Sequence, residues 1–187
     1  SVVGASRMER CRVVKNRMIY GRNASNYWGG ALAIANNEKE EYSNSCIVRN
    51  CEISNNVYEN YTRSGTATQF GAIGVSVSAG ILENCTIVSN IVKSSASTDG
   101  ACGVVGYHSA KGTIRNCLIA DNFYNGNLKN YSTVSTYGGG DNYHKRFVYC
   151  LTYPANSHLP SSTIISNEPK YRFAYSGKIK LERGWFR

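Results

Sequence analysis

Five side chains in the second half of the chain have the types needed for acid–base chemistry: Tyr107, His108, Lys111, Asp141 and His144. If the chain repeats with the period of its cysteines, His108 falls level with Asp141, and Lys111 falls level with His144. An imidazole or phenol could remove the proton beside a uronic acid carboxylate while a cation neutralises that carboxylate. One hypothesis is therefore a polysaccharide lyase that works by β-elimination, and the alternative is a solvated polar corner.

A second group of residues suits binding rather than catalysis. Four segments that follow a recurring asparagine are expected to be loops leaving one edge of the molecule, and three of them carry aromatic residues. Aromatic faces stack on sugar rings, and nearby polar groups bond to hydroxyls. The alternative is that the rings only anchor long loops. The segments are 17–28, 57–69, 91–98 and 123–136, and the candidate ligand-binding residues are Tyr20, Tyr27, Trp28, Tyr58, Tyr61, Tyr124 and Tyr131.

Other chemistries are disfavoured by what the chain lacks. Glycosidic hydrolysis needs two carboxylates acting as a pair, yet the sequence holds only three Asp, and its Glu residues are scattered. No cysteine or histidine spacing is typical of a zinc site. We therefore expect no cofactor and no bound metal, and we lean toward a protein that is not an enzyme.

The elements that would position these side chains come from a repeat built around cysteine. Cys11, Cys51, Cys85, Cys117 and Cys150 follow one another at intervals of 40, 34, 32 and 33 residues. A period between 20 and 50 residues indicates stacked repeats. Each copy contains short β-prone runs and no helical periodicity, which predicts an all-β fold, a right-handed parallel β-helix of about five coils. Residues 1–165 would form the coils, and residues 166–187 would form a C-terminal cap of the same domain.

Each copy has the same internal pattern. An Ile or Val two residues after cysteine shares a strand face with it, so both side chains should point inward. An Asn five residues after cysteine should occupy a tight left-handed corner. Those asparagines are residues 16, 56, 90 and 122, and the expected result is a buried ladder of thiols, with Cys46 and Cys102 lying off it.

Charges two residues before cysteine provide an independent check of this register. Glu9, Arg49, Glu83 and Arg115 alternate in sign, so stacking in register would place opposite charges on neighbouring strands. Arg12 and Glu52 would make another such pair. We interpret these charges as structural and not as site residues.

The repeat residues resemble a known family. Asn84-Cys85-Thr86-Ile87 followed by Asn90, and the runs Gly29-Gly30-Ala31-Leu32 and Gly71-Ala72-Ile73-Gly74, are similar to repeats of the pectin-lyase-like superfamily, in particular its surface-protein branch with polymorphic-outer-membrane-protein-like repeats. The resemblance covers residues 7–153 and implies the β-helix fold, not an activity. It also suggests a bacterial, secreted or cell-surface protein. The tail from Ser166 to Leu181 is similar to segments that close such helices.

The charge balance bears on partners. With 21 Lys and Arg against 12 Asp and Glu, the net charge of +9 favours polyanions such as acidic polysaccharide. The basic residues fall in two clusters at opposite ends of the chain rather than along one groove, which argues against nucleic acid. No apolar run could span a membrane. The leading hypothesis is a non-catalytic surface scaffold that binds a glycan or a protein partner; the alternatives are the lyase and a structural segment of a longer fibre or passenger protein.

Overall fold

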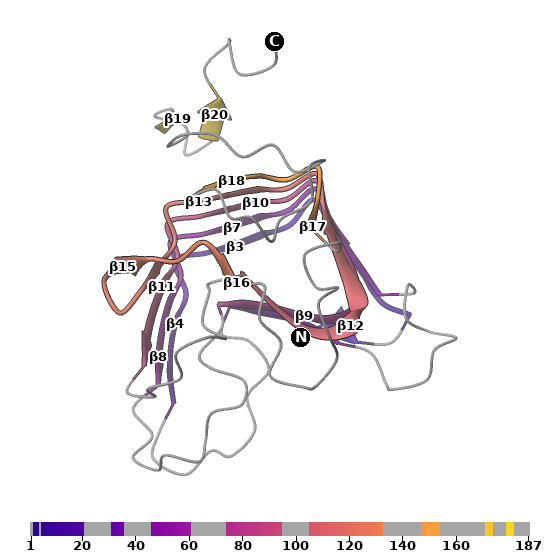
Figure 1. Cartoon of the computed structure of the whole chain (residues 1–187), viewed down its shortest axis with the longest axis horizontal. Coiled ribbons are helices and arrows are strands. Elements are labelled where there is room, and N and C mark those ends of the chain that lie inside the picture. Colours follow the sequence, from indigo (N-terminus) through magenta and orange to yellow (C-terminus); the bar gives the residue numbers. More distant parts are fainter. Residues whose placement is uncertain are drawn as a thin grey trace.

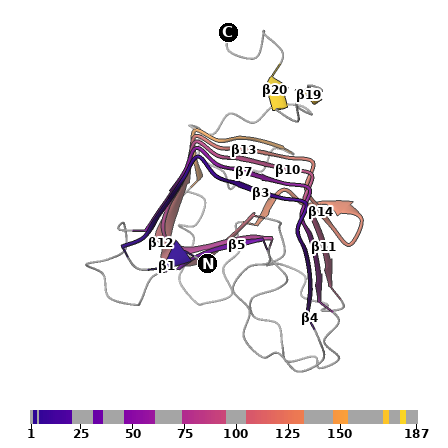
Figure 2. The ribbon, with the colours of Figure 1, turned by 180° about the vertical axis from the view of Figure 1, so that it is seen from behind.

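The computed structural model describes residues 2–3, 5–20, 31–35, 46–60, 74–94, 105–132, 147–153, 171–173 and 179–181. Strands are the only regular secondary structure among these residues, and they form stacked sheets that are nearly all parallel (Figure 1). The arrangement is compatible with a β-helix or solenoid, as the repeat predicts. Figure 2 shows the same three larger sheets from behind.

The largest sheet, sheet 1, has eight strands and collects the segments that precede each cysteine. Its main path is β1-β5-β9-β12-β16, with β2, β6 and β17 attached to it. The strands are β1 (Val2–Val3), β2 (Arg7–Glu9), β5 (Leu32–Ala35), β6 (Ile47–Arg49), β9 (Val75–Glu83), β12 (Val105–Arg115), β16 (Tyr131–Ser132) and β17 (Phe147–Val148).

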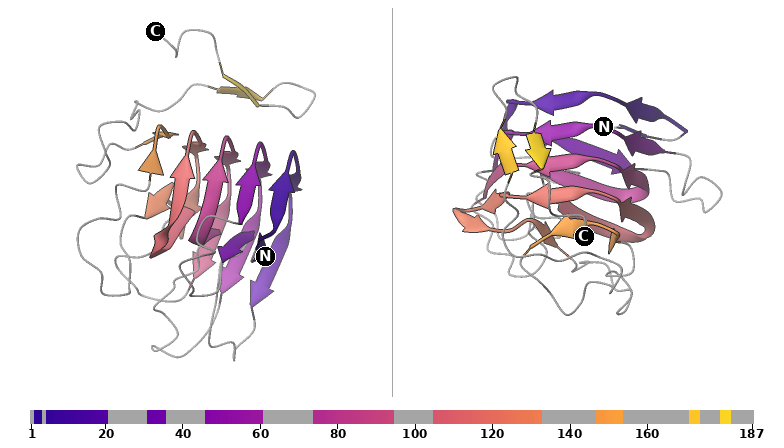
Figure 3. Two further views of the ribbon diagram at one scale, coloured as in Figure 1. Left: turned by 90° about the vertical axis from the view of Figure 1, so that its right-hand side faces the viewer. Right: turned by 90° about the horizontal axis from the view of Figure 1, so that it is seen from above.

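Two five-stranded sheets follow the cysteines. Sheet 2 has the order β18-β13-β10-β7-β3, so each successive copy of the repeat adds one strand to it (Figure 3). Sheet 3 has the order β15-β14-β11-β8-β4, in which the fourth copy adds both β14 and its antiparallel partner β15. Sheet 2 contains β3 (Arg12–Val14), β7 (Glu52–Ser54), β10 (Thr86–Val88), β13 (Leu118–Ala120) and β18 (Leu151–Thr152). Sheet 3 contains β4 (Arg17–Tyr20), β8 (Val57–Asn60), β11 (Ile91–Ser94), β14 (Phe123–Tyr124) and β15 (Asn127–Leu128).

The register of the sheets is the one that the repeat predicts. Ile53 pairs with Val13 on one side and Ile87 on the other, and Ile87 pairs with Ile119. These inward columns form the core: Ile53, Ile87 and Ile119 are fully buried. Stacking β-branched side chains at the strand spacing fills the narrow interior without a helix.

The thiol column is buried except at its first member. Cys51, Cys85, Cys117 and Cys150 are at most 3% exposed, whereas Cys11 is exposed because no described strand lies on its outer side. These thiols are free and bond to backbone carbonyls; the Sγ of Cys117 lies 3.2 Å from the Arg115 carbonyl oxygen. Burial raises the pKa of Cys117 well above the usual range of a thiol. The column therefore acts as apolar packing.

The sequence predicts that Cys46 and Cys102 lie off this column. Cys46 is nevertheless a fully buried member of the same core cluster, and burial raises the pKa of its thiol. Cys102 lies outside the described residues.

The predicted conformation of the recurring asparagine is wrong by one residue. Left-handed backbone occurs at the residue before it, with φ of 57° at Lys15, 55° at Asn55, 57° at Ser89 and 51° at Asp121. The residue before each cysteine of the thiol column is also left-handed, which gives sheet 2 a sharp corner at both ends of β3, β7, β10 and β13. The asparagine itself is free to turn its side chain inward.

Two predictions about strands and loops also need correction. The segments after the asparagine do not begin as loops, because their first residues form the strands of sheet 3. The repeat also predicts a separate short strand at residues 80–82 and another at residues 112–114, but in the structure these residues continue the strands that precede them, as parts of β9 and β12. Gly80 allows this in β9: it has φ +90°, and a Cβ there would lie 2.4 Å from the Cys46 carbonyl oxygen.

The predicted charge columns are confirmed. Ion pairs join Glu9 to Arg49 at 2.8 Å, Glu83 to Arg115 at 2.6 Å, and Arg12 to Glu52 at 2.8 Å. All three link neighbouring strands, so the charges support the register, as exposed cross-strand pairs do.

The tail forms a separate antiparallel pair, β19 (Tyr171–Phe173) with β20 (Ile179–Leu181). Whether residues 166–187 cap the stack stays a prediction.

Candidate functional site: an amide-lined cavity beside sheet 3

A column of asparagine side chains lines the inner corner between sheets 2 and 3. The amide nitrogen of each asparagine donates to the amide oxygen of the next at 2.9 Å, from Asn16 to Asn56, from Asn56 to Asn90 and from Asn90 to Asn122. The backbone N–H groups of the same three donors bond to the same oxygens at 3.1 Å. Because the inner members are at most 4% exposed, this satisfied network makes the corner rigid.

The last asparagine of the column does not occupy the repeat position of the others. The position five residues after Cys150 is Ala155, which has no amide side chain. Asn130 takes its place: its Oδ1 accepts from the Asn122 backbone N–H at 2.9 Å, and its Nδ2 donates to the Tyr153 carbonyl oxygen at 2.6 Å. The antiparallel hairpin of β14 and β15 brings Asn130 back to the column.

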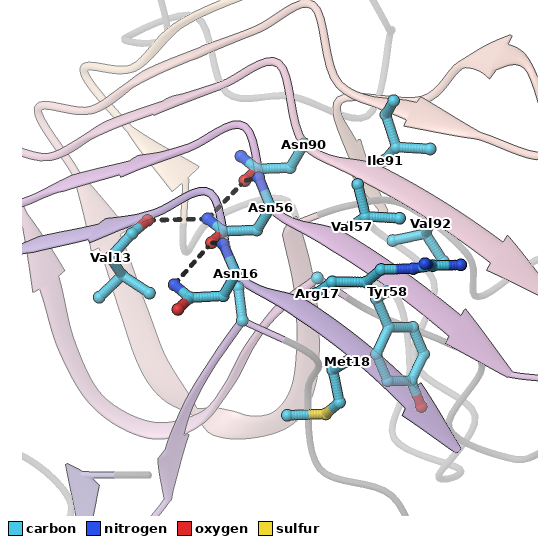
Figure 4. Close-up of a pocket in the computed structure, with 12 residues that line it drawn as sticks. Val13, Asn16, Arg17, Met18, Asn56, Val57, Tyr58, Asn90, Ile91 and Val92 are labelled. Atoms are coloured by element: carbon cyan, nitrogen blue, oxygen red, sulfur yellow. Dashed lines mark hydrogen bonds between the residues drawn. The ribbon is translucent and has the colours of Figure 1, made fainter. Parts of the chain in front are cut away.

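A cavity of about 410 Å³ lies along the inner side of sheet 3, next to this column (Figure 4). It reaches the surface at Asn16, Arg17 and Met18, which are exposed. The volume falls in the range of small-molecule sites, and most of the walls are apolar with a few amide groups, as ligand pockets usually are. The lining residues are Val13, Asn16, Arg17, Met18, Ala31, Asn56, Val57, Tyr58, Gly74, Asn90, Ile91 and Val92.

Tyr58 is the aromatic residue of this cavity. It lies in register between Met18 of β4 and Val92 of β11, and Val92 is in register with Tyr124. Tyr58 is only 3% exposed and packs with Val92 and the half-buried Tyr124. The side chain that sequence placed on a loop is therefore held on a strand, inside the wall of the cavity.

An ion-pair cluster lies on the same three strands. The buried carboxylate of Glu59 accepts a hydrogen bond from Arg17 Nη2 at 3.0 Å and another from Lys93 Nζ at 3.3 Å. The hydrogen bond from Arg17 is the main reason that the pKa of Glu59 is lowered, and Lys93 adds to the effect. The cluster holds the guanidinium of Arg17 on the face of sheet 3 that also carries Glu59.

The remaining predicted aromatic residues are spread over several places. Tyr131 packs against Phe147 with ring centroids 5.8 Å apart, and burial raises the pKa of Tyr131 to about 12. The backbone of Tyr20 ends β4. Tyr27, Trp28 and Tyr61 lie outside the described residues, as do most of the predicted loop segments. Of the seven aromatic candidates, the structure brings Tyr58 and Tyr124 together.

The predicted catalytic cluster lies partly inside and partly outside the described residues. Tyr107, His108 and Lys111 belong to β12, whose pairing with β9 shifts register between Tyr107 and Lys111. Asp141 and His144 are not described. The juxtaposition of these groups stays a prediction. Among the described residues, no group of His, Cys, Asp and Glu could hold a metal ion.

Sequence reasoning missed the inward role of Asn16, Asn56 and Asn90. A signal was present: the left-handed position before them varies among Lys, Asn, Ser and Asp, while the next residue is Asn in all four copies. A turn tolerates several residue types, whereas a stack of amides needs the same donor and acceptor on every rung.

Comparisons with protein-family models, with curated proteins and with solved structures found no match to this chain. Within the described part of the chain, no helix is long and apolar enough to cross a membrane.

Proposed function

We propose that this protein is a non-catalytic β-helix scaffold, secreted or displayed at a cell surface, that binds a glycan through the cavity beside sheet 3. The helix would be right-handed, with about five coils and a cap formed by residues 166–187. A protein partner is the other ligand class to which an aromatic wall of this kind is suited.

The observation that carries the proposal is the composition and rigidity of the cavity. Tyr58, Met18 and Val92 provide an apolar wall on paired strands, while the exposed amide of Asn16 provides a polar group at the mouth. Sugars present apolar faces edged by hydroxyls, so such a combination suits them. Strands fixed by the amide column would need little reorganisation on binding.

The proposal is tested by screening the protein on a panel of neutral and acidic polysaccharides, followed by calorimetry with the best ligand. Replacing Ala31, which lines the cavity, by Leu should fill part of the volume and weaken binding about tenfold or more. Asn16→Ala should weaken binding less, because one hydrogen-bonding group is lost.

Tyr149→Asn is the matched control. Tyr149 is 63% exposed and is not part of the cavity lining, so this variant should bind as the parent does. Circular dichroism spectra and melting curves must show that all variants are folded. Equal affinities for the parent and a folded Ala31→Leu variant would contradict the cavity as the binding site.

A further inference from the structure

The turn between β14 and β15 contains the only Asn-Gly pair of the sequence, Asn125-Gly126. The two residues have φ of 48° and 81°, the left-handed pair of a type I′ turn. Both are exposed, and Figure 2 shows the hairpin projecting from the stack beside β11. Both residues of the turn are therefore accessible to water.

An asparagine that precedes glycine can lose its side-chain nitrogen without an enzyme. The backbone nitrogen of Gly126 forms a bond to Cγ of Asn125, and the amide nitrogen of Asn125 leaves as ammonia with the proton that the Gly126 nitrogen loses. Water then adds to one carbonyl of the cyclic imide and breaks the bond from that carbonyl to the nitrogen. Opening at Cγ gives aspartate, and opening at the backbone carbonyl gives isoaspartate, so the whole reaction consumes one water and releases one ammonia.

Two features of the turn favour this reaction. Glycine has no side chain to hinder the approach of its nitrogen, and a Cβ built at Gly126 would meet no atom within 4 Å. The Gly126 N–H also donates to no group among the residues that the structure describes. No hydrogen bond within this part of the chain therefore has to break before the nitrogen reacts.

The chain contains an internal comparison for Asn125. Asn50, Asn84 and Asn116 are also exposed and have nearly the same left-handed φ, 55°, 52° and 52°. Each of them precedes a cysteine of the thiol column, and that cysteine is at most 3% exposed. The nitrogen that would have to react there belongs to a residue with a packed side chain, so the amide is the same but its neighbour is not.

The hairpin carries Asn130 to the end of the amide column. The strands β14 and β15 pair across the turn, and the N–H of Lys129 donates to the Asn122 carbonyl oxygen at 2.9 Å. This return places the Asn130 side chain where it bonds to the backbone of Asn122 and of Tyr153, both of which are buried. Because turn length sets the register of a hairpin, the length of the main chain at Asn125 decides whether Asn130 reaches the column.

We propose that Asn125 is a site of spontaneous deamidation, and that its isoaspartate product loosens the last rung of the amide column. The aspartate product keeps the turn, since Asp-Gly suits a type I′ turn as Asn-Gly does. Isoaspartate adds one methylene to the main chain before Gly126, so Tyr124 and Asn127 lose their pairing across a two-residue turn. The stack would then lose stability with the age of the protein.

Incubation of the full chain at mildly alkaline pH, followed by proteolysis and mass spectrometry, measures the reaction. Acid should accumulate at position 125 about tenfold faster or more than at Asn50, Asn84 and Asn116. Electron-based fragmentation of the peptides distinguishes isoaspartate from aspartate. Asn125→Gly is the matched control, because it removes the amide and leaves a Gly-Gly pair that a type I′ turn accepts.

Urea denaturation of the aged protein measures the consequence. The aged parent should show a second transition at lower urea concentration, with an amplitude that rises with the isoaspartate content, whereas aged Asn125→Gly should unfold as it does when fresh. Fresh Asn125→Asp carries the new charge on an ordinary main chain, so it should unfold at the same urea concentration as the fresh parent.

Any of three results would overturn the proposal. Equal rates at position 125 and at the other three asparagines would show that the turn confers no reactivity. An isoaspartate form that unfolds with the parent would show that the hairpin does not support the column. A fresh Asn125→Asp protein as unstable as the isoaspartate form would assign the effect to charge. Neither Asn125 nor Gly126 lines the cavity, so glycan binding is tested separately.

Discussion

Removal of the central rung of the amide column should be one of the most damaging single changes in this protein. The side chain of Asn90 is 1% exposed and takes part in five hydrogen bonds. Its oxygen accepts from the backbone and side chain of Asn56, and its nitrogen donates to the carbonyls of Ile53 and Val88 and to Asn122 Oδ1.

The magnitude follows from the groups that Asn90→Ala would strand. The backbone N–H of Asn56 would lose its acceptor, and the Ile53 carbonyl would lose the 2.9 Å bond from Asn90. The other partners keep alternatives: Asn56 Nδ2 still bonds to the Val13 carbonyl, and Asn122 Oδ1 still accepts from the Asn90 backbone. The stranded N–H costs about 1–3 kcal/mol and the lost bond to the Ile53 carbonyl about 1 kcal/mol, which together give roughly 2–4 kcal/mol.

Urea denaturation of the parent and Asn90→Ala, followed by circular dichroism, measures this loss as a change in the free energy of unfolding. Asn16→Ala is the matched control because the same side chain is exposed at the start of the column, and its removal should cost less than about 1 kcal/mol. Equal losses for the two variants would refute the claim that burial gives the column its strength.

Asn90→Asp gives a second test, because the new side chain has nearly the same shape as the old one. A buried carboxylate cannot donate to the Ile53 carbonyl or to Asn122 Oδ1, so the pKa of the new acid should be raised in the folded state. A raised pKa makes the folded state bind more protons, so stability should fall as pH rises from 4 to 7 relative to the parent. A pH-independent difference would argue against burial of that side chain.

Three further predictions concern single sites. Gly80→Ala should cost about 2 kcal/mol or more, because it adds a clash with the backbone to an unfavourable φ. Gly126→Ala should cost about 1 kcal/mol, because φ is +81° but no atom lies within 4 Å of the added Cβ. Equal losses in thermal or urea unfolding would contradict the steric argument. Tyr149→Asn should raise the free energy of unfolding by up to about 1 kcal/mol, since its φ of 53° suits Asn better; a lower stability would refute this. The pKa of Glu59 is lowered mainly by Arg17, so the ionised carboxylate stabilises the fold above the pKa of an unfolded glutamate, and this stabilisation is lost as pH falls through the folded pKa. Glu59→Gln should therefore reduce the loss of stability at acid pH. An unchanged dependence of the free energy of unfolding on pH would contradict the ion pair.

Local sequence predicted those features that depend on the alternation of strand faces and on the repeat period. The inward positions of Cys85 and Ile87 and the ion pair of Glu83 with Arg115 follow once strands alternate and copies stack in register. The exact site of the left-handed corner did not follow, because Asn is equally suited to a turn and to an inward amide stack. The choice between those roles depends on which neighbours the side chain meets.

The sequence by itself determined the stacked all-β architecture, because a recurring thiol, aliphatic and amide pattern with short β-prone runs has few other ways to bury its apolar side. Only the tertiary structure decided that Tyr58 lines a cavity and that Asn130 replaces a missing rung. Both outcomes depend on contacts between segments that no local pattern relates.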